Sequence, residues 1–91
     1  MKTGFLTVND PMGMHARPAG QLVQALRSCG AETRLSFGEK QADGSGLFSV
    51  MALGAKHGDT IRITLSGENC DAAAKNIKRF CEETPAFSAE F

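Results

Sequence analysis

The chain has 91 residues, with ten basic and ten acidic side chains, so its formal net charge at neutral pH is zero. This length predicts a single domain over residues 1–91 with a modest core, and the balanced charge argues against nucleic-acid binding, which usually requires a basic excess. No apolar run is long enough to span a membrane, and the first residues lack the apolar stretch of a secretory leader. Three widely spaced cysteines form neither a disulfide framework nor a metal-binding motif. We therefore expect a reduced cytoplasmic protein with no metal and no cofactor.

The first half of the chain predicts a strand, a helix and a hairpin. Residues 5–8 are rich in strand-forming side chains and end at a turn over 9–11. The helix that follows has apolar residues at the spacing of one helix face, and Gly30 is placed as its C-terminal cap. Those apolar residues are Ala19, Leu22, Val23 and Leu26. Alternating side chains over 33–37, a tight turn and a short arm over 40–43 then predict two paired strands.

The second half predicts a short helix, a strand and a long helix. The short helix covers 47–53 and is closed by Gly54. Residues 60–65 carry apolar side chains at every second position and form the clearest strand of the chain. Asn69 is placed to cap the last helix. The buried face of that helix is predicted to contain Ala73, Ala74, Ile77, Phe80 and Cys81. Residues 84–91 are expected to form a loosely packed tail, although Phe87 and Phe91 could each pack back.

His15 lies where the first predicted helix begins, and its surroundings make it the main candidate for chemistry. Pro18 suits the first turn of a helix because its missing N–H is no loss there. The free N–H groups and the positive dipole end of a helix start attract phosphate, and Arg17 adds a guanidinium two residues after the histidine. The phosphate could be a bound ligand or could be carried on the imidazole. Without further context, a lone histidine at a helix start is more often a polar surface residue.

Three segments of the chain resemble one family. The run Gly13-Met14-His15-Ala16-Arg17-Pro18-Ala19 is similar to the active-site signature of HPr, the histidine-containing phosphocarrier of the bacterial sugar phosphotransferase system. The segment 47–54 and the turn Gly58-Asp59 before the strand over 60–65 also look like that family. The resemblance covers nearly the whole chain, because its length and its order of elements, β-α-β-β-α-β-α, match as well.

The resemblance implies an α+β fold, an open-faced β-sandwich in which three helices cover one face of a four-stranded antiparallel sheet. It implies a monomeric phosphocarrier rather than an enzyme with its own turnover. His15 would accept a phosphoryl group on Nδ1 from phosphorylated enzyme I, which takes it from phosphoenolpyruvate, and would pass it to an enzyme IIA. The backbone N–H groups of Ala16 and Arg17, with the Arg17 side chain, would neutralise the phosphoryl oxygens during transfer.

The resemblance also implies a docking surface. Leu47, Phe48 and Met51 match an apolar patch with which the family contacts its partners, and we expect Phe48 and Met51 to be partly exposed. Gly20 and Arg27 complete the predicted partner-binding set, with Arg27 steering acidic partners.

Two positions depart from the family pattern. Gram-positive relatives carry a regulatory serine where this chain has Gly46, so control by a serine kinase is not expected at that position. Ser45 precedes it and is predicted to cap the short helix instead. Met12 replaces a polar residue that often lies beside the histidine, which removes one hydrogen bond that the imidazole could make.

The sequence is compatible with two other functions. The first is an HPr-like regulatory module, phosphorylated on His15 but serving a nitrogen-type or other signalling branch. The second is a module of the same fold that binds an anion or a partner at the helix start without covalent chemistry. Labelling by phosphoenolpyruvate and enzyme I would separate the carriers from the second alternative.

Overall fold

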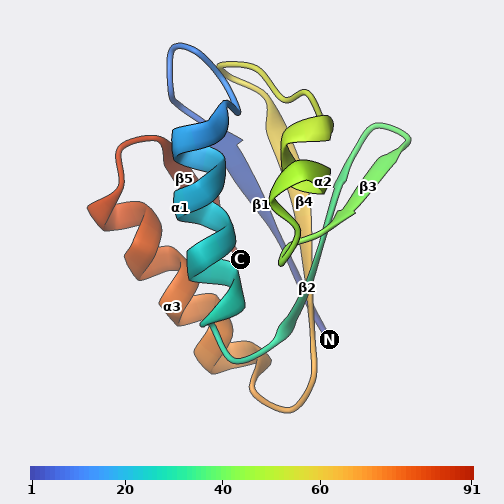
Figure 1. Cartoon of the computed structure of the whole chain (residues 1–91). Coiled ribbons are helices and arrows are strands. Elements are labelled where there is room, and N and C mark those ends of the chain that lie inside the picture. Colours follow the sequence, from blue (N-terminus) through green and yellow to red (C-terminus); the bar gives the residue numbers. More distant parts are fainter.

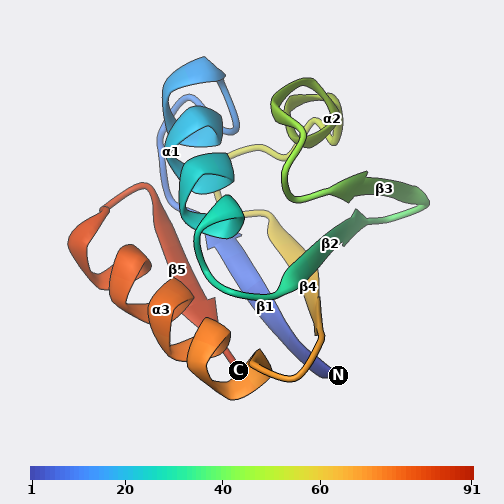
Figure 2. The same ribbon diagram turned by 60° about the horizontal axis from the view of Figure 1, so that its bottom comes forward.

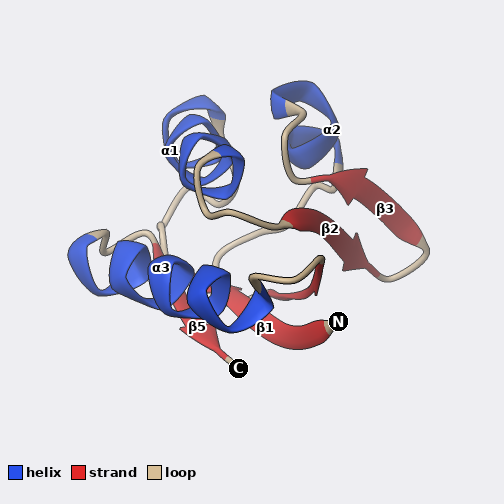
Figure 3. Cartoon of the chain, turned by 90° about the horizontal axis from the view of Figure 1, so that it is seen from below, coloured by secondary structure: helices blue, strands red, loops and turns tan.

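The computed structural model describes all of residues 1–91, which form a five-stranded antiparallel sheet and three helices (Figure 1). The elements are β1 (Lys2–Val8), α1 (Ala16–Arg27), β2 (Glu32–Phe37), β3 (Lys40–Asp43), α2 (Leu47–Ala52), β4 (Thr60–Ser66), α3 (Cys70–Glu83) and β5 (Phe87–Glu90). The strands lie in the order β3-β2-β4-β1-β5. Figure 3 shows the helices gathered on one side of this sheet. The predicted open-faced α+β sandwich is therefore confirmed.

The predicted four-stranded sheet had one strand too few. The C-terminal residues form β5, which runs antiparallel to β1 and pairs Phe87 with Val8 and Ala89 with Leu6. Phe87 is buried, and its ring centre lies 6.2 Å from that of Phe80 on α3. The tail is thus an edge strand rather than a loosely packed segment. Its four residues are too few for alternation to be a clear signal in the sequence.

A cluster of 22 buried apolar residues fills the space between the sheet and the helices. Alternate side chains of each strand point into it, because successive residues of a strand face opposite sides of the sheet. The fully buried members from β1, β2 and β4 are Leu6, Val8, Leu35, Ile61, Ile63 and Leu65. The predicted apolar faces of α1 and α3 pack against them, except that Phe80 is only partly buried. This packing holds α1 in place along its length and so fixes the position of its first turn.

The helices begin and end close to the predicted residues. His15 stands at the N-cap of α1, Gly46 at that of α2 and Asn69 at that of α3. The Asn69 side chain makes no capping hydrogen bond, so the predicted side-chain cap of α3 is wrong. Ser28, rather than the predicted Gly30, is the C-cap of α1. Gly30 lies two residues further on and has a φ of +98°, a conformation that residues other than glycine rarely adopt.

Candidate functional site

The first turn of α1 presents two backbone donors beside His15. The histidine backbone is extended (φ −95°, ψ −176°), and its carbonyl accepts the N–H of Ala19 at 3.0 Å. The N–H groups of Ala16 and Arg17 precede the first intrahelical donor and make no hydrogen bond within the chain. Pro18 has no N–H. The helix start therefore offers two free donors and its positive dipole end at the position of the histidine.

The loop that leads to His15 is held by its own backbone. The N–H of Gly13 donates to the carbonyl of Asp10 at 2.9 Å, and the N–H of Met14 donates to the carbonyl of Ala55 at 3.0 Å. Gly13 has a φ of +75°, and a Cβ on it would lie 3.0 Å from the Ala55 oxygen. A glycine is therefore required by conformation and by space. These constraints fix the approach of the chain to the helix start.

Asp10 lies against the imidazole of His15. Its Oδ1 is 3.3 Å from His15 Nε2, and the two side chains are 24% and 38% exposed. The sequence pattern predicted only a turn at Asp10. A spacing of five residues from the histidine matches neither helix nor strand periodicity. Only the reversal of the chain at residues 10–13 brings the two side chains together. A carboxylate in a turn just before a histidine was the one available signal.

Arg17 is exposed and forms no hydrogen bond or ion pair within the chain. It belongs to the same helical turn as the two free N–H donors. An arginine without a partner retains its full set of N–H donors for an anionic group. His15, Ala16 and Arg17 thus all belong to the start of α1, and their role in phosphoryl transfer stays a prediction.

The predicted docking residues belong to α2, which lies beside α1 (Figure 2). Phe48 is 84% exposed, whereas Leu47 and Met51 are partly buried against the core. Met12, in the loop before His15, is 79% exposed. We call Leu47, Phe48 and Met51 the α2 patch. The expected exposure of Phe48 and Met51 is confirmed, and the exposed ring of Phe48 dominates the patch.

Gly20 lies on α1 one turn after the helix start, and a Cβ placed there would meet no atom within 4 Å. The fold itself thus does not require a glycine at this position. A missing side chain leaves the helix backbone accessible from outside.

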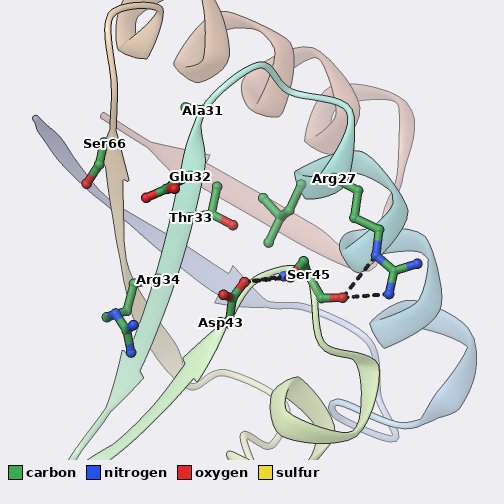
Figure 4. A pocket seen from close by; sticks show the side chains of 9 residues that line it. Arg27, Ala31, Glu32, Thr33, Arg34, Asp43, Ser45 and Ser66 are labelled. Carbon is green, nitrogen blue, oxygen red and sulfur yellow. Dashed lines mark hydrogen bonds between the residues drawn. The ribbon is translucent and has the colours of Figure 1, made fainter.

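Arg27 ties the C-terminal end of α1 to the segment before α2 (Figure 4). Its Nε and one terminal nitrogen donate to the carbonyl of Ser45 at 2.9 and 2.6 Å. Arg27 and Ser45 line a pocket of about 410 Å³, together with Asp43, Arg34 and five further residues. His15 is not among the residues that line it. The guanidinium is thus committed to a structural contact, although it is still exposed.

Ser45 does not cap α2, contrary to prediction. Its N–H and its hydroxyl both donate to Asp43 Oδ1, at 2.9 and 2.7 Å. Gly46 is the N-cap residue, and its carbonyl accepts the N–H of Val50 at 3.0 Å. The backbone hydrogen bond from Ser45, followed by the side-chain one, keeps the pKa of Asp43 below its usual value. The hydroxyl is engaged one residue before the position at which a capping serine would act.

The three cysteine thiols are enclosed. Cys29, Cys70 and Cys81 are all buried and unpaired. Burial raises the pKa of the Cys81 thiol to about 11, which disfavours the reactive thiolate. The Cys70 thiol donates to the carbonyl of Gly67 at 3.0 Å. None of the three helices combines the length and the apolar character that a membrane-spanning segment requires.

The chain matches the family model described as "PTS HPr component phosphorylation site" over residues 3–83. It is 38% identical over 83 residues to the phosphocarrier protein HPr of Lysinibacillus sphaericus, covering 91% of this chain and 94% of that protein. It is 32% identical over 84 residues to the HPr of Xylella fastidiosa, covering 87% and 94%.

Solved structures of HPr proteins share the fold of this chain. The histidine-containing phosphocarrier protein of Mycoplasma superposes with a TM-score of 0.83 at 28% identity, covering 93% of this chain and 97% of that one. The HPr of Thermoanaerobacter tengcongensis, at 23% identity, shares the fold with a TM-score of 0.80 over 91% and 93% of the two chains. A helix start with free donors beside a histidine, on this fold and with these relatives, places the chain in the HPr family of phosphocarrier proteins.

Proposed function

We propose that this chain carries a phosphoryl group on Nδ1 of His15. It receives the group from phosphorylated enzyme I, which is charged by phosphoenolpyruvate, and passes it to an enzyme IIA of sugar transport, as a cytoplasmic monomer. The observation that carries the proposal is the pair of unused N–H donors at Ala16 and Arg17, which lie beside a half-exposed imidazole.

Transfer needs little beyond a nucleophile and donors in fixed positions, because phosphoryl transfer depends mostly on positioning and electrostatics. The Nδ1 lone pair forms a bond to phosphorus while the bond from phosphorus to the donor nitrogen breaks. The electron pair of that bond leaves with the donor. The free N–H groups and the Arg17 guanidinium stabilise the three equatorial oxygens as their charge shifts. The reverse sequence of events delivers the group to the acceptor.

A carrier must contact at least two partners through one face. The α2 patch supports this requirement, because an exposed phenylalanine and a flexible methionine adapt to different surfaces. Gly20 adds a place where a partner can approach the α1 backbone closely, and the exposed charge of Arg27 adds attraction for acidic surfaces.

The test is to incubate the protein with enzyme I and labelled phosphoenolpyruvate, and then to add an enzyme IIA. The expected result is an acid-labile, base-stable phosphate on His15 that moves to the acceptor. Labelling that does not pass to any sugar-specific IIA would favour a regulatory branch. If no label is bound covalently and phosphate is held only reversibly, the protein is an anion-binding module and the proposal is wrong.

A further inference from the structure

We infer that Asp10 is a positioning residue for phosphoryl transfer by His15. In this role its carboxylate faces Nε2, directs the incoming phosphoryl group to Nδ1 and balances the positive charge that the ring gains. The inference rests on the proposed function, and it assigns a residue that the signature around His15 does not include.

The Asp10 carboxylate is itself held in place. Its Oδ1, the oxygen 3.3 Å from His15 Nε2, also accepts the backbone N–H of Met12 at 2.9 Å. The carbonyl of Asp10 accepts the N–H of Gly13 at 2.9 Å, which closes the turn. An oxygen anchored in this way cannot swing freely into solvent. The turn therefore presents a fixed negative charge to one edge of the imidazole.

The negative charge at the Nε2 edge of the imidazole determines which ring nitrogen reacts. A carboxylate beside Nε2 favours the form of the ring that carries its proton there, because an N–H is attracted to the oxygen and a lone pair is repelled. Nδ1 is then left with the lone pair that a nucleophile requires. Side-chain contacts of this kind are often long in a resting site and shorten when the reacting group is bound. The separation of 3.3 Å between Asp10 Oδ1 and His15 Nε2 is short enough for a hydrogen bond to form when the reacting group binds.

The charge of Asp10 matters most after the bond to phosphorus has begun to form. Attack by Nδ1 leaves the ring with a proton on Nε2 and a formal positive charge. A carboxylate 3.3 Å away stabilises this cation relative to the neutral ring. Arg17 acts on the phosphoryl oxygens, and Asp10 acts on the ring, so the two residues compensate opposite charges. Because the pair is partly open to water, we expect an effect of about tenfold on rate.

Reaction with phosphoramidate tests the inference without any partner protein. This small donor of phosphoryl groups would be used at about pH 8.5, where an ordinary imidazole is neutral. The variants are Asp10→Asn, whose amide oxygen can still accept the Met12 N–H, and Asp10→Ala, which removes the contact. The control is Asp71→Asn, which removes the same charge from the start of α3, where Lys2 is the partner at 3.0 Å. Two-dimensional NMR spectra verify that each variant is folded.

We expect both Asp10 variants to react about tenfold more slowly than wild type, since both lose the negative charge. In Asp10→Ala, NMR of the ring nitrogens should also show phosphate on Nε2 as well as on Nδ1, whereas Asp71→Asn should match wild type. Rates within twofold of wild type in both Asp10 variants, with phosphate on Nδ1 only, would overturn the inference. A protein that reacts with phosphoramidate but not with enzyme I would disprove the proposed function and leave this test valid.

Discussion

The two ends of α1 differ in how their polar groups are used. At the N-terminal end, two backbone N–H groups and the Arg17 guanidinium have no partner within the chain. At the C-terminal end, Arg27 donates two hydrogen bonds to the Ser45 carbonyl, and Ser45 in turn donates two to Asp43. Two arginines of one helix are therefore used differently: Arg27 is paired within the chain and Arg17 is not. The free donors lie at the proposed site of phosphoryl transfer, and the paired donors hold the segment before α2.

The largest expected effect is at the N-terminal end. His15→Ala should abolish phosphorylation by enzyme I and phosphoenolpyruvate, because no other side chain combines an imidazole with free helix-start donors. The fold should persist, since a half-exposed histidine contributes little to stability. The measurement is incorporation of labelled phosphate. His57→Ala, which removes an exposed histidine from a turn, is the control and should label normally. Normal labelling of the His15 variant would overturn the assignment.

Arg17→Ala should slow transfer without abolishing it. The N–H groups of Ala16 and residue 17 remain as donors, so we expect a loss of about 10- to 1,000-fold in single-turnover transfer, as for removal of one electrostatic stabiliser. Arg79→Ala, which removes an exposed arginine of α3, is the matched control. A rate for the Arg17 variant within twofold of wild type would show that the guanidinium has no such role.

Changes in the α2 patch and at the C-terminal end of α1 should affect binding to partners and leave the chemical step intact. We expect Phe48→Ala to weaken binding to enzyme I by about 30-fold, as for a buried aromatic anchor of an interface. Arg27→Ala should weaken it by only a few-fold, since it loosens the segment before α2 and leaves the ring in place. Calorimetric titration measures both, and phosphoramidate labelling should be unchanged. A slower phosphoramidate reaction in either variant would contradict the division between the start of α1 and the segments proposed to bind partners.

The smallest effect is expected from a serine kinase of the kind that acts on Gram-positive relatives. The chain should stay unmodified, because Gly46 has no hydroxyl and that of Ser45 already donates to Asp43 at 2.7 Å. Incubation with ATP and such a kinase, followed by mass spectrometry, measures this. Gly46→Ser should restore phosphorylation and serves as the positive control. Efficient modification of Ser45 in the natural sequence would show that the neighbouring serine substitutes for the missing one.

The sequence predicts the structure correctly where the signal lies within a few neighbouring residues. The start of α1 is marked within six residues by Gly13, His15 and Pro18, and the helix begins directly after His15. Apolar spacing likewise identified the inward faces of α1 and β4, because periodicity reports which side of an element is buried.

The sequence alone did not predict which polar groups pair with each other or which distant segments lie side by side. The Ser45 hydroxyl could form a hydrogen bond with the start of α2 or with Asp43. Only the path of the hairpin brings it to Asp43. The contact of Asp10 with His15 depends on how one loop folds back. The pairing of β5 with β1 joins residues 79 or more positions apart, for which no spacing rule exists.

The pairing of β5 also has a consequence for self-association. Without it, β1 would be an edge strand of seven residues with its ladder groups unpaired along one side. With it, the sheet ends in two strands of four residues each, β3 and β5, and the first carries Lys40. Short and charged edges offer little template for another chain to add a strand. For the proposed carrier, which would meet one partner after another, these edges disfavour aggregation through the sheet.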